Sequence, residues 1–418
     1  MSSHEFSPYQ GSECAVGWNI ATRMAAYHDV TLLCADGTAL EYGLYSRAVA
    51  DYMKKNGPIP GLRIVYVKQP PETMRYARIN KRLMSLTKGY GWQVLFFMGL
   101  DRWHQAAFHT ASKLGMENFD AVHQLTPISF LKPGYLWTGD KPFFWGPLGG
   151  MYKVPKTFAS TSGVKAFVLE TLRSANIDRL VQTDRFTSIV KKASRIWTVS
   201  GNERCIVNAI SPDKAVPMID TSPPVSIKGF VRHYDGEKPL RLCWSGLHST
   251  SKALPLLLHA IVKIDSCENI ILDVLGEGPE TENWQNMAKD LKLNQITWHG
   301  RRPYNEALAI MGRADLFVHT SFREAASMVV LEALGWGLPV ICHDACGMGI
   351  AVDETCGIKV PFKNPEVSIQ GFACALGRVL SNPGLVRELS EGALNRASVL
   401  SWDAKVKEMA DAYMHYVR

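Results

Sequence analysis

From about residue 240 onward the chain alternates short apolar runs with amphipathic segments, and this alternation limits the possible folds more than any other feature. The apolar runs are LRLCWSG, IILDVLG, QITWHG, DLFVHTS and LPVICHD, and segments such as ALPLLLHAIVKI and NWQNMAKDLKL lie between them. Buried parallel strands joined by helices produce this order. The C-terminal half is therefore predicted to be a doubly wound, Rossmann-like α/β domain.

The N-terminal half repeats the alternation more loosely. Its expected strands are DVTLLCA, LRIVYVKQ, FDAVHQ, KPFFWGP and RIWTVSG, after a first strand of only two or three residues. Five prolines and little periodicity mark residues 211–239 as a connection. We expect an N-terminal domain at 1–215, a linker at 216–239, a C-terminal domain at 240–400, and a final helix at 401–418 that crosses back to the first domain. Two such domains face each other across a cleft, where ligands bind.

Composition narrows the class of protein. The 418 residues are 46% hydrophobic and 20% charged, as in soluble globular proteins. The longest uninterrupted apolar stretch, VLFFMGL, is far shorter than the roughly 20 residues that span a bilayer. No secretory signal opens the sequence, so we expect a cytoplasmic protein. The nine cysteines lack zinc-ligand spacing and predict reduced thiols rather than a metal site.

Charge is distributed unequally. Residues 1–200 contain 24 Lys and Arg against 14 Asp and Glu, a net of +10, while residues 201–418 contain 22 against 25, a net of −3. The excess is densest in residues 68–88, where four cations recur at helical spacing: Arg75, Arg78, Lys81 and Arg82. Such a helix either lies on an anionic membrane surface or is an ordinary solvated helix face. The dispersed charge and the lack of a recognition motif argue against nucleic acid as a partner.

Two carboxylates, Glu324 and Glu332, lie eight positions apart in SFREAASMVVLEALGWGLPVI, among small and apolar residues. The sequence predicts a strand, a loop, Ser327 as an N-cap and a short helix. A helix N-terminus with free N–H groups is a site for phosphate. With a diphosphate there, the two carboxylates would accept hydrogen bonds from a hexose on one side and a ribose on the other.

In this context the chain resembles the retaining glycosyltransferases of family 4, which have the two-domain GT-B fold. Glu324 and Glu332 match their E-x7-E motif. The likeness extends through VLGEGPETENWQNMAKDLKLNQITWHGR, ADLFVHTS and SWDAKVKEMADAYMHYV, and, for a bacterial polysaccharide or lipopolysaccharide branch, through SPYQGSECAVGWN, FDAVHQLTPISFLKPGYLW and KPFFWGPLGG.

The resemblance implies an activity. It implies that a hexose moves from a nucleotide sugar, UDP-sugar first and GDP-mannose next, to a saccharide or lipid-linked saccharide in envelope polysaccharide biosynthesis. It also implies retention of anomeric configuration and a reaction without a metal or other cofactor. Together with the basic N-terminal domain, it suggests peripheral association with the inner face of the cytoplasmic membrane.

The resemblance also assigns roles in the C-terminal half. Glu324 would contact the donor sugar as a catalytic residue, and Glu332 the ribose. The backbone amides that would hold the sugar and phosphates belong to Ala326, Ser327 and Met328.

A basic pair in the pattern G-R-x-x-x-x-K neutralises the diphosphate in the family. The segment SGLHSTSKA keeps Gly246 and Lys252 but has Leu247 at the arginine position. A leaving diphosphate needs cationic or N–H stabilisation, so either His248, Arg301 or another basic side chain compensates or the activity is reduced. Arg301 also falls where the family's chain passes the nucleobase.

In the N-terminal half, Gly11 and Ser12 open the helix after the first strand, and the family's corresponding loop lies near the diphosphate. Glu13 either touches the diphosphate or acceptor or supports the first helical turn through the dipole. His123 is placed at the carboxyl end of the strand FDAVHQ, pointing into the cleft. The family has a histidine close to the donor sugar there, so we favour a catalytic His123 over a structural one.

Two aromatic residues are the last site candidates. Tyr135 and Trp137 either stack on a sugar acceptor or anchor the loop that contains them.

Two rival functions stay open. One rival is a non-catalytic protein that binds a sugar nucleotide or glycan, which Leu247 favours. The other is a GT-B epimerase, which the E-x7-E context disfavours. A nicotinamide dehydrogenase is weaker still, because no GxGxxG follows a strand.

Overall fold

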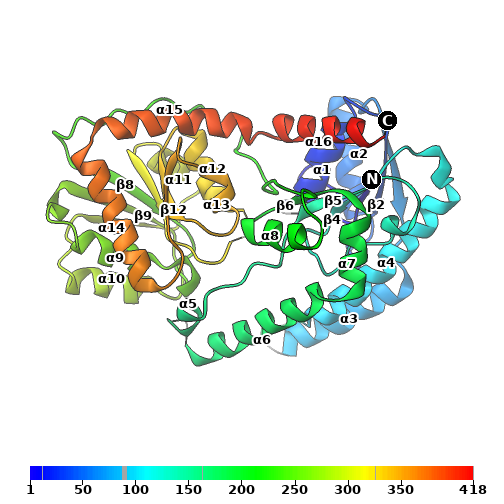
Figure 1. The fold of residues 1–418 in the computed structure, drawn as a ribbon, viewed down its shortest axis with the longest axis horizontal. Coiled ribbons are helices and arrows are strands. Elements are labelled where there is room, and N and C mark those ends of the chain that lie inside the picture. The colour runs from blue at the N-terminus through cyan, green and yellow to red at the C-terminus, as the bar shows by residue number, and fades with distance from the viewer. Residues whose placement is uncertain (12, 87–91, 162, 325, 418) are drawn as a thin grey trace.

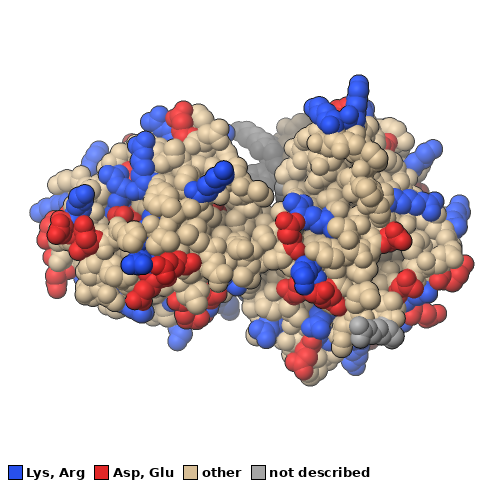
Figure 2. Space-filling view, turned by 90° about the horizontal axis from the view of Figure 1, so that it is seen from above, with Lys and Arg blue, Asp and Glu red and all other residues tan. Residues whose placement is uncertain are grey.

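The computed structural model describes residues 1–11, 13–86, 92–161, 163–324 and 326–417. It consists of two α/β domains side by side, with long C-terminal helices running along one edge of both (Figure 1). Seen from above, the domains form two lobes joined at a narrow waist, and basic and acidic side chains are interspersed over that face (Figure 2).

The first domain contains a seven-stranded sheet in the order β3-β2-β1-β4-β5-β6-β7, and all of its neighbouring strands pair in parallel. The strands are β1 (Ser2–Ser3), β2 (Val30–Ala35), β3 (Leu62–Val67), β4 (Val122–Thr126), β5 (Phe143–Leu148), β6 (Ala193–Thr198) and β7 (Ala215–Pro217). Strand β1 sits between β2 and β4. Strands β2 and β3 are added on one side of β1 and the later strands on the other, so the winding of the sheet reverses at β1.

The second domain contains a six-stranded parallel sheet in the order β10-β9-β8-β11-β12-β13. Its strands are β8 (Leu240–Ser245), β9 (Ile270–Leu275), β10 (Ile296–Gly300), β11 (Leu316–His319), β12 (Val340–His343) and β13 (Gly357–Val360). The prediction of two parallel, doubly wound sheets is confirmed. Each apolar run named from the sequence overlaps a strand, whereas β7 and β13 were not predicted.

Helices cover both faces of each sheet. Those of the first domain are α1 (Glu13–Met24), α2 (Leu44–Asn56), α3 (Pro71–Leu86), α4 (Gln93–Lys113), α5 (Lys156–Thr161), α6 (Val164–Val181), α7 (Asp184–Lys192) and α8 (Gly201–Ile210). The second half contains α9 (Leu254–Val262), α10 (Thr281–Asp290), α11 (Tyr304–Met311), α12 (Met328–Gly335), α13 (Met348–Ala351), α14 (Pro365–Ser381), α15 (Gly384–Val399) and α16 (Trp402–Tyr416). Among the described residues, no helix is both long and apolar enough to cross a bilayer.

Two segments tie the domains together. Helix α16 returns to the first domain, where Val406, Met409 and Tyr413 pack against Val16 and Ile20 of α1. The segment around α5 reaches the other way, and Phe158 stacks on Phe362 of the second domain at a ring-centroid distance of 4.4 Å. Burial of these apolar side chains stabilises the contact between the two domains.

Candidate active site

The second sheet reverses its winding between β8 and β11, and ligands of such sheets bind outside the carboxyl ends of the strands at this point. The loop after β8 carries Lys252, and the loop after β11 carries Glu324. The hydroxyl of Thr320 donates to the carbonyl of Lys252 at 2.7 Å, which holds the two loops together. The fold therefore brings the predicted lysine and the first motif carboxylate to one place.

Glu324 is held by cations and N–H groups. The Lys252 ammonium donates a hydrogen bond to Glu324 Oε1, and both side chains are mostly buried. The same oxygen lies 3.5 Å from His319 Nε2. Burial would raise the pKa of Glu324, but hydrogen bonding and charge from His319 and Lys252 outweigh it and lower the pKa to about 2. The carboxylate is therefore ionised at neutral pH.

His319 is a site residue that the sequence analysis missed. It is the last residue of β11 and is buried, and its Nε2 lies 3.0 Å from Ser327 Oγ at the start of α12. Burial lowers the pKa of His319, and the hydrogen bond and negative charge of Glu324 act in the opposite direction. Ser327 occupies the predicted N-cap position, but its hydroxyl contacts His319 rather than a backbone N–H of the helix.

The helix that follows, α12, and the residues at its start include the other positions predicted to bind the nucleotide-sugar donor. The first N–H groups of an α-helix have no intrahelical acceptor. Because α12 begins at Met328 with Ser327 as its N-cap, the amides of Ser327 and Met328 lie at this end, and Ala326 directly precedes it. Glu332 lies farther along α12 and is buried, and it accepts a hydrogen bond of 3.0 Å from the hydroxyl of Tyr304 on α11. Burial raises the pKa of Glu332. Tyr304 was not predicted, because it is 28 positions away in sequence.

A hollow of about 1420 Å³ lies at the carboxyl ends of β8, β9 and β10. Gly246, Leu247, Glu277 and Arg301 line it, and the Arg301 N–H donates to Glu277 Oε1 at 2.9 Å. A Cβ atom on Gly276 would lie 1.9 Å from the Gly246 carbonyl oxygen, so this crossing of two loops requires a glycine. The loops form a wall in which Arg301 is a cation and Leu247 is an exposed apolar side chain.

The other expected compensating residue does not face the hollow. His248 is buried, its Nδ1 lies 2.9 Å from Thr281 Oγ1, and its ring packs against Trp284. Arg301 is therefore the better placed of the two to contact a diphosphate.

The first domain contributes its own sheet edge. Gly11 is exposed ahead of α1, and Ser12 lies outside the described residues. Glu13, the first residue of α1, accepts a hydrogen bond of 3.1 Å from the Ile128 N–H, in the loop after β4. This bond joins the two loops that flank the reversal point of the first sheet. Burial and the nearby Glu5 carboxylate raise the pKa of Glu13 to about 7, and Asp220 adds to the effect.

Replacing Glu13 by Gln tests this environment. The Glu13 carboxyl has a pKa of about 7 in the folded protein and 4.5 in the unfolded chain. At a pH between these values the folded protein holds a proton that the unfolded chain has released. The stability of the wild type therefore falls as the pH rises through this range. At about 1.4 kcal/mol for each pKa unit, the wild type should lose about 3 kcal/mol relative to Glu13→Gln between pH 4.5 and 8. Urea unfolding of both proteins across this range measures the difference. A difference that does not change with pH would contradict the assignment.

The predicted position of His123 is wrong. His123 is the second residue of β4, so it lies near the amino end of the strand rather than the carboxyl end. Its side chain is buried between α16 and β5, where Nδ1 contacts the Tyr413 hydroxyl and Nε2 lies 2.7 Å from the Gly146 carbonyl oxygen. Burial lowers the pKa of His123 to about 3, which keeps the ring neutral. The contacts fasten α16 to the sheet.

Substitution of Tyr413 by Phe tests this structural role. The change leaves His123 Nδ1 buried without a partner, which costs about 1–3 kcal/mol of stability. We expect chemical denaturation to show that loss, with nucleotide affinity unchanged. Tyr416→Phe, on the same helix, is the matched control and should change stability by less than about 0.5 kcal/mol. Loss of nucleotide binding at unchanged stability would restore His123 to the site.

The aromatic candidates lie against the first domain's own helices. The Tyr135 hydroxyl donates to Asp101 Oδ2 at 3.2 Å and accepts from Gln105, both on α4. Trp137 Nε1 donates to the Gly134 carbonyl at 3.1 Å, and its ring is partly buried on the core. Neither residue contacts the hollow of the second domain, and a role in acceptor binding stays a prediction.

Between the domains lies a cleft of about 1700 Å³ lined by residues of both. Tyr152 and the start of α8 form its first wall, and Cys346 and Asp344 belong to the second. Arg323, beside Glu324, approaches Glu170 of α6 with a nitrogen-to-oxygen distance of 3.8 Å. The loop that carries Glu324 thus faces the first domain.

Residues 233–396 match the family model of glycosyl transferases group 1. The C-terminal domain is therefore similar to the group 1 glycosyltransferases. A D-inositol 3-phosphate glycosyltransferase from Streptomyces bingchenggensis is 31% identical over 180 residues, which cover 40% of the present chain and 38% of the relative. An uncharacterized glycosyltransferase from Methanocaldococcus jannaschii is 26% identical over 174 residues. The chain thus spans about two fifths of the length of these relatives.

Solved structures share the fold over nearly the whole chain. The lipopolysaccharide outer core galactosyltransferase WaaB superimposes with a TM-score of 0.61 and 14% identity, covering 99% of the present chain and 98% of WaaB. Sucrose-phosphate synthase from Thermosynechococcus elongatus gives a TM-score of 0.59 and 15% identity, covering 99% and 95%. The fold is therefore GT-B, as predicted, with one sheet in each of two facing domains.

Proposed function

We propose that this chain transfers a hexose from a nucleotide sugar to a saccharide acceptor with retention of anomeric configuration. The observation that carries the proposal is the cluster of Glu324, Lys252 and His319 at the start of α12, on the reversal point of the second sheet. A cation, a carboxylate and a helix N-terminus meet there, which suits a sugar joined to a diphosphate.

The proposed donor pose follows from these groups. The diphosphate lies against the α12 N-terminus with Lys252 beside it, and Arg301 approaches from the wall of the hollow. The ribose lies at Glu332, where the Tyr304 hydroxyl is already a hydrogen-bond partner. The hexose lies at Glu324. An Anabaena protein of the same fold, HepE, has been solved with UDP at a TM-score of 0.53 and 13% identity, which supports UDP as the first nucleotide to test.

The proposed chemistry is a same-face substitution. The bond between the anomeric carbon and the phosphate oxygen breaks, the acceptor oxygen attacks from the same side, and its proton passes to the leaving phosphate. Lys252 and the α12 N–H groups stabilise the charge that develops on the diphosphate. The Glu324 carboxylate stabilises the positive charge that develops on the sugar.

The proposed acceptor is a lipid-linked saccharide of the bacterial envelope, reached at the inner face of the cytoplasmic membrane. Support comes from α3, whose exposed Arg75, Arg78, Lys81 and Arg82 would face anionic lipid. The face seen in Figure 2 carries both signs of charge, interspersed.

A non-catalytic binding protein is the second candidate, and exposed Leu247 favours it. Leu247→Arg tests the point directly. If the site lacks one cation for a diphosphate, the variant should bind UDP about 10-fold more tightly, as expected for one added charge-assisted hydrogen bond. Equal affinity of wild type and variant would show that Arg301 already compensates.

Calorimetric titration tests the proposal as a whole. Wild-type protein is titrated without metal against UDP, GDP, ADP and their hexose conjugates. Selective binding of one nucleotide supports the donor site and names its class. The absence of binding to all of them at millimolar concentration would contradict it.

A further inference from the structure

The first domain contains a second hollow that the donor and its chemistry do not use. It has a volume of about 850 Å³ and lies between α3, α4 and the loops after β1 and β2. Its apolar lining includes Ala77 and Met84 of α3, Leu95, Phe96 and Leu100 of α4, and Leu40. Apolar walls with a few polar groups are typical of small-molecule sites.

The polar groups of this hollow lie at its two ends. His4 and Glu5 follow β1 at the carboxyl edge of the sheet, and Cys14 Sγ of α1 lies 3.6 Å from Glu5 Oε2, one residue from Glu13. Lys81 lines the hollow on the α3 side. The inner end is therefore next to the sheet edge that faces the cleft, where an acceptor is expected.

Two lining residues mark where the hollow opens. Met84 is 43% exposed and Phe96 is 49% exposed, although both line the hollow. The exposed apolar surface continues along the α3–α4 hairpin through Leu86, Trp92 and Val94, which are 80%, 60% and 65% exposed. So many exposed large apolar residues on one hairpin indicate contact with an apolar phase or ligand.

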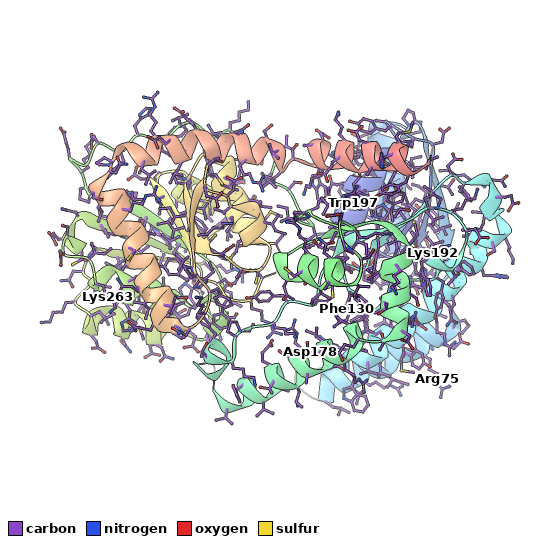
Figure 3. All side chains as sticks on the ribbon, viewed as in Figure 1. Arg75, Phe130, Asp178, Lys192, Trp197 and Lys263 are labelled. Atoms are coloured by element: carbon purple, nitrogen blue, oxygen red, sulfur yellow. The ribbon has the colours of Figure 1, made fainter. Side chains whose placement is uncertain are left out.

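The helix that forms one wall of the hollow is also strongly basic. Helix α3 contains Arg75, Arg78, Lys81 and Arg82 against a single acid, Glu72. Arg75 lies on the lower, outer side of the molecule (Figure 3), away from α15 and α16. An apolar hollow with cations at its mouth is complementary to a hydrocarbon chain that ends in a phosphate.

We propose that this hollow binds the hydrocarbon chain of a phosphate-linked lipid acceptor, with the phosphate at Lys81 and the neighbouring arginines. The inference rests on the proposed function, because it identifies the class of acceptor for the same cleft. The proposed position holds the hydrocarbon chain of the lipid in the first domain and leaves the saccharide end of the acceptor free to reach Glu13 and the sugar donor.

Displacement of a fluorescent probe tests this site. Cis-parinaric acid, an 18-carbon polyene whose emission rises in apolar surroundings, is bound first and then displaced by farnesyl phosphate or by farnesol. Ala77→Trp fills the hollow and should weaken both displacers at least 10-fold. Lys81→Gln should weaken farnesyl phosphate about 5–10-fold and leave farnesol unchanged. Dodecyl phosphate in place of farnesyl phosphate distinguishes a saturated alkyl chain from a prenyl chain.

Controls separate this inference from the donor site. His109→Trp adds the same ring to the exposed side of α4, outside the hollow, and should leave the displacement curves unchanged. Met84→Gln, an exposed substitution at the mouth that leaves the core intact, should weaken both displacers about threefold. If wild type binds UDP but shows no saturable parinarate binding, or if Ala77→Trp binds like wild type, the lipid site is overturned while the donor site stands. Failure of UDP binding alone would instead contradict the proposed function.

Discussion

Glu324→Gln should lower the rate of sugar transfer roughly 10²–10³-fold while the Kd for the nucleotide changes less than threefold. The Glu324 carboxylate is ionised and held by Lys252 and His319. In the proposed pose its charge opposes the positive charge that develops on the sugar, and loss of one preorganised electrostatic partner typically costs this much. The diphosphate and ribose contacts are retained, so binding survives. Turnover of the nucleotide sugar and calorimetry measure the two quantities.

Glu354→Gln provides the matched control, because Glu354 is an exposed acid in the turn before β13. Its turnover should remain within twofold of wild type. If Glu324→Gln also retains full turnover, Glu324 has no part in the reaction. A loss of binding in Glu324→Gln would instead mean that the residue holds the loop in place.

Lys252→Met should raise the Kd for UDP about 10–100-fold and leave uridine binding unchanged. A charge-assisted hydrogen bond to a phosphate contributes about 1.5–3 kcal/mol, and Lys252 is the cation in direct contact with Glu324 at the start of α12. Its loss also removes the ion pair that keeps the pKa of Glu324 low. Titration with UDP, UMP and uridine separates the phosphate contribution from that of the nucleoside.

Lys263→Met is the control for charge and size. Lys263 (Figure 3) follows the C-terminal end of α9, whereas Lys252 precedes its N-terminal end, and Lys263 pairs with Glu366 on α14 at 3.4 Å. Its substitution should not change UDP affinity. Equal effects of the two substitutions would mean that the net charge of the protein, and not the position of Lys252, governs UDP binding.

The fold was largely predictable because buried parallel strands are apolar throughout. Runs such as IILDVLG and LPVICHD contrast sharply with the amphipathic helices around them, and each corresponds to a strand. Strands β7 (Ala215–Pro217) and β13 (Gly357–Val360) were missed because they are short edge strands next to Pro or Gly. Such edge strands leave little apolar pattern.

The error at His123 arose from a strand boundary. The apolar run FDAVHQ suggested a strand ending at His123, whereas β4 begins at Val122 and ends at Thr126. A shift of three or four residues moves a side chain from one end of a sheet to the other. The same strand-end argument applied to DLFVHTS would have selected His319, which contacts Glu324.

Other site features depend on tertiary structure alone. The Tyr304–Glu332 hydrogen bond joins two helices, and the Glu13–Ile128 bond joins residues 115 positions apart. No local spacing encodes either contact. By contrast, Glu324, Glu332 and Lys252 were selected from sequence because the motif and the strand-end loops fix their positions relative to one sheet edge.

The most direct test of the central claim is proton NMR of the sugar that the protein releases from an α-linked UDP-hexose, with Glu324→Gln in parallel. The account predicts slow, metal-independent cleavage by wild type, with the α-anomer formed first, and little cleavage by the variant. Release of the β-anomer first would contradict a retaining reaction. Tight UDP-hexose binding with no cleavage, even when lipid-linked saccharide is supplied, would show that the cleft binds sugar nucleotides without transferring them.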